Sequence, residues 1–393
     1  MRIAIVVPSW PPGRTANGII TYASQIVPAL RRLGHEVYVL TPQASVSSND
    51  PFTIDLSQFS PTGFSGLWSR LRRQSAIELI GHQLRAALQT LKSRVGIDVL
   101  EIEESFGWSA VLSEAKIVPI IVRLHGPWFL TGVFDSNSQD AFEGRIRKEG
   151  EGIARAAIVT SPSKAGLEAV RRRYGIPLDR AKIIPNPIQP LLRGTGWKRD
   201  ICEMDRILFV GRFDLLKGAD VVLRAFQILA RKYPNLRLTF AGPDKGISER
   251  GEKLSITQFI RRHLPESEPR IDYLGLVQPD QLLQLRPQHA FTIVASRFEM
   301  FSYAVAEAMA LGSPIVASSA GAMSELIEDG ATGLLFESED VDSLVRNCER
   351  FLNDPALLEK CAQAARTFSE DRLHPDVLAK ETEAAYLSAL SSN

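Results

Sequence analysis

Short apolar segments alternate with helical patterns along almost the whole of this 393-residue chain, and that alternation restricts the fold more than any other feature. The segments are unbroken apolar runs, which is typical of strands buried on both faces. Strands are predicted at Ile3–Val7, Glu36–Leu40, Val99–Ile102, Pro119–Leu124, Ala157–Thr160, Lys182–Ile184, Arg206–Val210, Arg237–Ala241, Ile271–Leu274, Phe291–Val294 and Pro314–Ala317. The helices predicted between them include Ile19–Leu33, Asp220–Lys232 and Val305–Leu311. Such repetition requires right-handed crossovers and predicts an α/β fold with doubly wound parallel sheets.

The series of strands restarts in the middle of the chain. Between the two series, the stretch IIPNPIQPLLRGTGWKRDICEMDR carries prolines and glycines that prevent regular structure. We therefore predict a Rossmann-like domain over residues 1–187, a linker over 188–204 and a second such domain over 205–373. The last 40 residues or so read as two helices with no strand between them.

Composition narrows the class of protein further. Hydrophobic residues make up 45% of the chain and charged residues 23%, which excludes a disordered chain, a collagen-like repeat and a disulfide scaffold. The net charge of +1 hides an uneven distribution, because residues 1–190 carry 22 basic and 16 acidic side chains, and residues 191–393 carry 24 and 29. The whole chain therefore gives no reason to expect a nucleic-acid partner, whereas its first half is basic enough to attract an anionic one.

The cysteines and the apolar segments indicate a location. Cys202, Cys348 and Cys361 form no C-x-x-C pair, and we predict buried or half-buried thiols in a reducing compartment. No segment reaches the roughly 18 uncharged apolar residues of a membrane span. The opening segment MRIAIVVPSW fits a strand better than a signal peptide. We expect a cytoplasmic protein.

A loop rich in glycine and proline follows the first predicted strand, and it opens onto a helix that begins near Ile19. The free N–H groups and dipole of such a helix start favour an anion. Gly13 and Gly18 stand five residues apart, so the loop does not match G-x-G-x-x-G, and an NAD-linked oxidoreductase fits poorly. A plain β–α turn is the alternative to a phosphate site here.

Two cations follow the first strand of the second series. Arg212 comes directly after Gly211, and Lys217 lies just before the next predicted helix. Ligands bind at this carboxyl edge of parallel sheets, and an arginine fork with a lysine point charge suits a diphosphate. The alternative is a pair of solvated surface cations.

Two glutamates flank the start of another predicted helix, near Ser302. The spacing puts Glu299 in the loop and Glu307 inside the helix, among apolar residues where an unpaired carboxylate is costly. Glu307 therefore needs a partner, either the hydroxyl groups of a ligand or a core arginine. A turn of small residues, Ala320 to Ala322, follows the next strand at the same sheet edge.

These residues carry a family resemblance. VGRFDLLKG, FAGPD, YLGLV, the Glu-x7-Glu pair and EAMALGSPIVASSAGAMSELIEDGATGLLF resemble retaining glycosyltransferases of family 4, over about 170 contiguous residues. The first half is similar to the same family through PPGRTANG, RLHGP, and TSPSKA followed by IIPNPI. The resemblance implies the GT-B fold: two Rossmann-like domains facing a central cleft, with a C-terminal helix at 374–393 packed back onto the first. A nucleotide-sugar donor would bind to the second domain and an acceptor to the first.

The resemblance also implies site residues. The catalytic residues would be His125, Arg212, Lys217 and Glu299. The donor-binding residues would be Asn17, Gly18, Gly211, Arg212, Lys217, Leu276, Val277, Glu299, Phe301, Ser302 and Glu307. Arg212 and Lys217 would hold the diphosphate, Glu307 the ribose, and Glu299 the transferred sugar, with main-chain N–H groups at the helix start on the phosphate.

Three positions depart from the family pattern. Asn17-Gly18 replaces the usual Gly-Gly, and the turn is expected to survive because Asn accepts a positive φ. Met300 stands where a small residue or proline is common, and Ser302 where glycine is common. These changes leave the donor sugar open.

The implied reaction moves a sugar from a nucleotide-diphospho-sugar to a hydroxyl group, with retention and without a metal or other cofactor. A UDP- or GDP-sugar is the expected donor, and a glycan, glycolipid or polysaccharide precursor the expected acceptor. A sugar-phosphate synthase with a soluble acceptor is the alternative within this fold. A non-catalytic nucleotide-sugar-binding protein is the alternative from another class.

A basic helical pattern runs over residues 68–94. It carries one acid, Glu78, and six basic residues: Arg70, Arg72, Arg73, Arg85, Lys92 and Arg94. Such a helix suits peripheral contact with an anionic membrane, at the inner face of the cell membrane. The alternative is an amphipathic helix that covers the sheet and turns its basic face to water.

Overall fold

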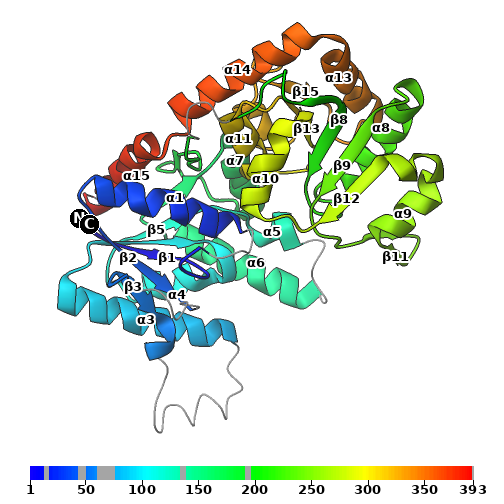
Figure 1. Cartoon of the computed structure of the whole chain (residues 1–393). Coiled ribbons are helices and arrows are strands. Elements are labelled where there is room, and N and C mark those ends of the chain that lie inside the picture. Colours follow the sequence, from blue (N-terminus) through cyan, green and yellow to red (C-terminus); the bar gives the residue numbers. More distant parts are fainter. Residues whose placement is uncertain (13–16, 43–49, 60–75, 133–138, 191–195, 392–393) are drawn as a thin grey trace. The chain divides into compact units, whose positions relative to one another are not determined.

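The chain divides into two compact units in a computed structural model (Figure 1). The first unit contains residues 1–187 and 375–393, and the second contains residues 188–374. The structure describes residues 1–12, 17–42, 50–59, 76–132, 139–190 and 196–391. The two units are treated separately below.

A parallel sheet forms the centre of the first unit. Its described strands lie in the order β3-β2-β1-β4-β5-β6-β7. They are β1 (Arg2–Val6), β2 (Glu36–Thr41), β3 (Thr53–Asp55), β4 (Val99–Glu103), β5 (Ile120–Arg123), β6 (Ile158–Ser161) and β7 (Lys182–Ile183). All of β4, β5 and β6 is buried, as unbroken apolar runs predict for strands covered on both faces.

Helices cover this sheet, and one of them comes from the end of the chain. The described helices are α1 (Gly18–Arg32), α3 (Ala76–Val95), α4 (Trp108–Glu114), α5 (Trp128–Thr131), α6 (Gln139–Ala154), α7 (Lys164–Tyr174) and α15 (Pro375–Leu390), with short 3-10 turns at Leu56–Phe59 and Ser105–Gly107. Helix α15 packs against α1, β5 and β6. Its Tyr386 is fully buried and donates a hydrogen bond of 2.8 Å to the carboxylate of Glu101 on β4.

The second unit repeats the plan with its own parallel sheet, in the order β12-β9-β8-β13-β14-β15. These strands are β8 (Glu203–Val210), β9 (Arg237–Ala241), β12 (Ile271–Gly275), β13 (His289–Val294), β14 (Ile315–Ser318) and β15 (Leu334–Phe336). A small antiparallel hairpin, β10 (Ile247–Glu249) with β11 (Glu252–Leu254), stands beside the sheet.

The helices of the second unit bury their apolar faces on this sheet. They are α8 (Ala219–Lys232), α9 (Ile256–His263), α10 (Pro279–Leu285), α11 (Tyr303–Leu311), α12 (Met323–Leu326), α13 (Val341–Asn353) and α14 (Pro355–Arg372), with 3-10 turns at Pro265–Arg270 and Arg286–Gln288. One core joins α8, α9 and α13 to the sheet through phenylalanines such as Phe209, Phe226 and Phe351. A second core joins α11 to α14 and to β14.

The described residues of the segment expected to be a linker lie on the second unit. The N–H of Ile188 donates to the carbonyl of Leu373, and the N–H of Trp197 donates to the carbonyl of Leu311. The indole of Trp197 donates to the carbonyl of His289. The described part of this segment is therefore fixed to the second unit, and its Glu203 and Met204 already belong to β8.

Candidate functional site

In each sheet the chain reverses its direction of strand addition at one point. In the second unit that point lies between β8 and β13, which are neighbours with parallel pairing of Ile207 to Phe291. Loops that leave the carboxyl ends of two such strands diverge and create a ligand site in doubly wound folds. The predicted residues Arg212, Lys217 and Glu299 all lie in these two loops.

The loop after β8 is held by an aspartate that sequence reasoning did not single out. Asp214 accepts a hydrogen bond of 2.7 Å from the Nε of Arg212 and one of 2.8 Å from the main-chain N–H of Lys217. Gly218 follows as the N-cap of α8, with φ at +66°. A Cβ at Gly218 would lie 2.0 Å from the carbonyl oxygen of Ala295, so only glycine lets the two loops approach this closely.

Lys217 and Glu299 meet across the two loops. The Nζ of Lys217 lies 2.5 Å from Oε1 of Glu299, and the hydroxyl of Ser296 donates to the same oxygen at 2.7 Å. The side chains retain 27% and 14% of their exposure, so the pair is partly accessible. The backbone of Glu299 is fixed as well, because the N–H of Ala322 donates to its carbonyl and Gly321 packs against it. The predicted small-residue turn therefore supports Glu299.

The start of α11 lies directly after Glu299. Ser302 is the N-cap, and its hydroxyl accepts a hydrogen bond of 3.4 Å from the N–H of Val305. Its hydroxyl therefore serves the helix. Among the described residues, none accepts a hydrogen bond from the main-chain N–H of Phe301 or Ser302, and free amides at a helix start attract anions.

Glu307 lies in α11, as its spacing from Glu299 predicts, and its partner is a core arginine. The Nη2 of Arg286 lies 3.0 Å from Oε2 of Glu307. The Arg286 side chain has no exposed surface, whereas that of Glu307 keeps 28%. The sequence predicted either ligand hydroxyl groups or a core arginine as the partner of Glu307. The core arginine is present, and the Glu307 side chain is still partly accessible.

Three glycines bring the loops after β8, β9 and β12 together. A Cβ at Gly242 would lie 1.9 Å from the carbonyl oxygen of Gly211, and the N–H of Gly242 donates to the carbonyl of Gly275. Leu276 and Val277 follow directly, and Leu276 is 58% exposed. The predicted donor-binding residues Gly211, Leu276 and Val277 thus lie along one edge of the sheet with Arg212.

In the first unit, Asn17 and Gly18 form the start of α1. Asn17 has φ of −144°, so the positive φ considered for it is wrong. Its side chain instead accepts hydrogen bonds from the N–H groups of Ile19 and Ile20, which is the usual role of asparagine at an N-cap. Gly18 is the first residue of the helix, one position earlier than predicted.

His125 follows β5 and lies beside the first turns of α1. Its ring meets that of Tyr22 edge to face, with centroids 5.1 Å apart. Burial and the nearby charge of Arg123 hold the pKa of His125 well below its usual range, so the ring is neutral at neutral pH. A neutral imidazole has both a donor and an acceptor nitrogen for a ligand.

The loop that carries His125 rests on two buried glutamates that the sequence analysis did not select. Glu104 accepts hydrogen bonds from the main-chain N–H groups of His125, at 2.9 Å, and Gly126, at 2.6 Å. Glu149 accepts one of 2.8 Å from the N–H of Trp128. The position of His125 is therefore set through its main chain.

Comparison with known proteins identifies the family. The family model described as Glycosyltransferase Family 4 matches residues 16–190, and that described as Glycosyl transferases group 1 matches residues 203–368. The chain is a family 4-like glycosyltransferase with the GT-B fold.

Individual relatives match over the full length. An uncharacterized glycosyltransferase of Methanocaldococcus jannaschii is 25% identical, with 99% of each chain covered. Among solved structures, sucrose-phosphate synthase of Thermosynechococcus elongatus is similar with a TM-score of 0.75 and 20% identity, covering 100% of both chains. Anabaena HepE in complex with UDP-glucose is similar with a TM-score of 0.67 and 17% identity, again covering 100% of both.

The glycosyltransferase contains one Asp-x-Asp pair, Asp340 and Asp342, a pattern through which metal-dependent transferases often bind a cation. Here Asp340 is the N-cap of α13 and accepts a hydrogen bond from the N–H of Ser343, and Asp342 lies in the first turn. Both carboxylates therefore stabilise a helix start. Across the described residues, no group of three or more His, Cys, Asp and Glu side chains is arranged to hold a metal ion.

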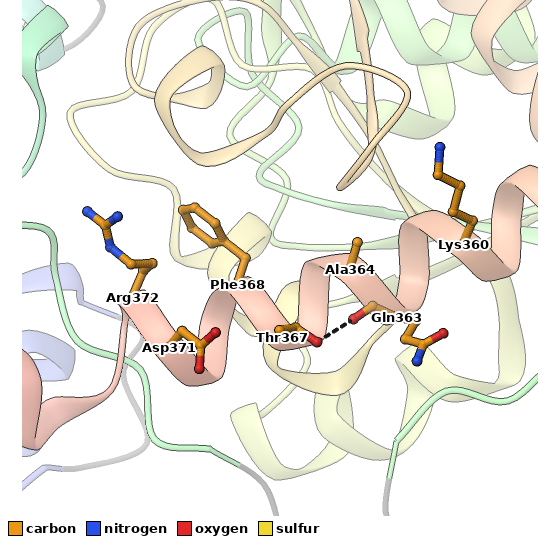
Figure 2. Close-up of a pocket in the computed structure, with 7 residues that line it drawn as sticks. All are labelled: Lys360, Gln363, Ala364, Thr367, Phe368, Asp371 and Arg372. Carbon is orange, nitrogen blue, oxygen red and sulfur yellow. Dashed lines mark hydrogen bonds between the residues drawn. The ribbon is translucent and has the colours of Figure 1, made fainter.

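A separate hollow lies on α14, away from the predicted site residues (Figure 2). Its lining comes from this single helix: Lys360, Gln363, Ala364, Thr367, Phe368, Asp371 and Arg372. Figure 2 shows Lys360, Ala364, Phe368 and Arg372 projecting from the same side of α14, as their four-residue spacing requires. No predicted site residue contributes to it.

The described part of the basic segment, α3, covers the sheet. Leu84, Leu88 and Leu91 are buried, whereas Arg85 and Arg94 are exposed. This is the arrangement of an amphipathic helix on a core. Arg70, Arg72 and Arg73 lie outside the described residues. No helix in the described part of the chain combines the length and the apolar character needed to cross a membrane.

Proposed function

We propose that this glycosyltransferase moves a sugar from a nucleotide-diphospho-sugar to a hydroxyl acceptor with retention of configuration and without a metal ion. The observation that carries the proposal is the contact between Lys217 and Glu299 where β8 and β13 diverge, beside Arg212. A cation for a diphosphate and a carboxylate for sugar hydroxyls are thus adjacent at the point where this kind of fold binds ligands.

The donor's charge determines the role of each group. Departure of the nucleotide builds negative charge on the diphosphate and positive charge on the anomeric carbon. Lys217, Arg212 and the amides of Phe301 and Ser302 would stabilise the diphosphate, because they are fixed in place before the reaction. Glu307 would accept hydrogen bonds from the ribose. On binding, the phosphate would replace Glu299 as the partner of Lys217, and the carboxylate would become available to sugar hydroxyls.

The retaining step would take place on one face of the sugar. The bond from the anomeric carbon to the phosphate oxygen breaks, the bond to the acceptor oxygen forms, and the acceptor's proton passes to the departing phosphate oxygen. No side chain has to accept this proton. A neutral His125 would serve as a hydrogen-bonding partner of the sugar rather than as a charged acid.

UDP-glucose is our first choice of donor, because a relative of the same fold is solved in complex with it. A sugar phosphate is the alternative acceptor, and the likeness to a sucrose-phosphate synthase favours it. A glycan or lipid-linked acceptor and a peripheral membrane contact through residues 68–94 stay predictions.

The test is a panel of UDP-, GDP- and ADP-sugars, scored by the shift in melting temperature and by slow hydrolysis of the donor. One nucleotide class should stabilise the protein and be hydrolysed. Lys217→Ala and Glu307→Ala should each lose at least about a hundredfold in turnover, since one preorganised partner contributes on the order of 3 kcal/mol. If no donor raised the melting temperature of the protein and none was hydrolysed, the proposal would be refuted.

A matched control is available in the same unit. Lys232 also pairs with a glutamate, Glu349, but at the end of α8 and largely exposed. Lys232→Ala should keep wild-type turnover. Equal losses in Lys217→Ala and Lys232→Ala would show that the effect is not specific to the site.

A further inference from the structure

A fully buried guanidinium lies directly beneath the carboxylate proposed to bind ribose. Arg286 belongs to the 3-10 turn between α10 and β13, and its side chain has no exposed surface. Its Nη2 contacts Glu307 at 3.0 Å, and its Nη1 lies 3.5 Å from the hydroxyl of Thr292. Its Nε is buried and bonds to none of the described residues.

This arrangement is poorly explained by stability alone. A buried guanidinium is expensive to desolvate, and burial lowers the pKa of Arg286 from its usual value. A buried ion pair is often replaced by apolar residues without loss of stability. Glu307 also stands next to apolar residues in α11, where Val305, Ala306, Ala308 and Met309 are all buried.

The geometry leaves one side of the carboxylate free for a ligand. Arg286 occupies Oε2 of Glu307, while Oε1 has no hydrogen bond to any described residue. Glu307 keeps 28% of its side-chain exposure and Arg286 none, so the carboxylate lies between the guanidinium and solvent. Arg286 therefore holds the carboxylate through Oε2 and leaves Oε1 available to a ligand.

We propose that Arg286 is a positioning residue that holds the Glu307 side chain in the correct orientation for the vicinal hydroxyl groups of the donor's ribose. The inference rests on the proposed function, since Glu307 is the ribose partner only there. Without Arg286, the carboxylate would turn toward water, and the nucleotide would lose the hydrogen bonds to its ribose but not those to its diphosphate.

The experiment compares binding of two probes by calorimetry: the nucleoside diphosphate among UDP, GDP and ADP that binds the wild-type protein, and its 2′,3′-dideoxy analogue. The wild type should prefer the native nucleotide by at least about tenfold, as expected for hydrogen bonds to a charged group. Arg286→Met should bind the analogue as well as the wild type does, and should prefer the native nucleotide by less than about threefold. A merely structural role would weaken both probes alike.

Two further variants keep the result interpretable. Arg286→Lys retains the charge but not the fork of the guanidinium, and we expect an intermediate preference. If Arg286→Met fails to fold, the nucleotide preference of Arg286→Lys tests the role of Arg286. Arg270→Met is the control, because within the described part of the chain Arg270 donates to the main-chain carbonyls of Ala230, Tyr233 and Pro234, at the C-terminal end of α8. It should keep the wild-type preference.

The outcomes separate the two proposals. A wild-type preference in the Arg286 variants would overturn the role of Arg286 alone. A wild-type protein that binds a nucleotide but does not distinguish it from the dideoxy analogue would overturn the ribose role of Glu307, and this inference with it.

Discussion

Gly218 shows how a single residue determines whether the loops after β8 and β13 can approach each other. Its φ of +66° is one that L-residues adopt at a cost, and its α-carbon faces the carbonyl of Ala295 from the loop after β13. Any side chain there would separate the loops that carry Lys217 and Glu299. The glycine is thus required by the contact as well as by the turn.

Gly218→Ala should therefore be far more costly than the same change at Gly312. Both glycines are left-handed, with φ of +66° and +62°, but the nearest atom to a Cβ at Gly312 is 3.4 Å away. We expect Gly312→Ala to lower the free energy of unfolding by about 1 to 2 kcal/mol. Gly218→Ala should add about 1 to 3 kcal/mol for the clash and should also weaken nucleotide binding. Equal effects in chemical denaturation would contradict this account.

At the scale of elements, the end of β4 is the most unusual part of the first unit. Glu103 and Glu104 are buried there, near Arg145 and Glu149 of α6. Burial raises the pKa of Glu103 to about 7, and burial together with the Glu149 charge raises that of Glu104 to about 8. The main-chain bonds from the His125 loop need the oxygens of Glu104, which a protonated carboxyl still supplies in part.

These pKa values predict that the first unit becomes less stable as the pH rises. Between about pH 5 and pH 8 the folded protein holds protons that the unfolded chain has released, so the free energy of unfolding falls with increasing pH. The melting temperature should decrease over this range, and Glu103→Gln should reduce the decrease by removing one titrating group. Glu114→Gln, a change at an exposed carboxylate of α4, is the control, and its melting temperature should decrease with pH as that of the wild type does. If the melting temperature of Glu103→Gln decreased with pH as steeply as that of the wild type, buried Glu103 would not contribute to the pH dependence.

Particular residues show how far the sequence predicts this molecule. Unbroken apolar runs located the long strands to within a few residues, because burial on both faces leaves a clear signal. The three-residue strands β3 and β15 and the β10–β11 hairpin were missed, since so few residues carry no periodicity. For the site, Arg212, Lys217, Glu299 and Glu307 could be selected from motifs at the sheet edge. Asp214, Arg286 and Glu104 could not, because their roles depend on contacts that only the folded chain creates.

At the scale of the whole molecule, the last helix belongs to the unit in which the chain began. Tyr386 of α15 and Tyr22 of α1 both donate to Oε2 of Glu101, which is 2% exposed, and the guanidinium of Arg123 lies over the Tyr22 ring.

Helix α15 also changes the charge balance between the two units. With α15 included, the first unit carries 23 basic and 19 acidic residues, and the second carries 23 and 26. The contrast between the units is therefore smaller than a division at residue 190 suggests.

Tyr386→Phe should destabilise the first unit selectively. It removes a partner from a buried carboxylate, which costs about 1 to 3 kcal/mol. Hydrogen exchange should speed up in β4 and β5 and stay unchanged in β8 and β13. Tyr38→Phe, which removes a hydroxyl bonded to the partly exposed Glu36, should have little effect. Faster exchange in both sheets would show that α15 also supports the second unit.

The return of α15 has a consequence for synthesis of the protein on the ribosome. The described strands and helices of the second unit emerge before residue 375, whereas the first unit lacks α15 until residues 375–390 have left the exit tunnel. The second unit can therefore complete its fold while Glu101 in the first unit still lacks its Tyr386 partner. Of the two units, the one that begins to emerge first is therefore the one completed last.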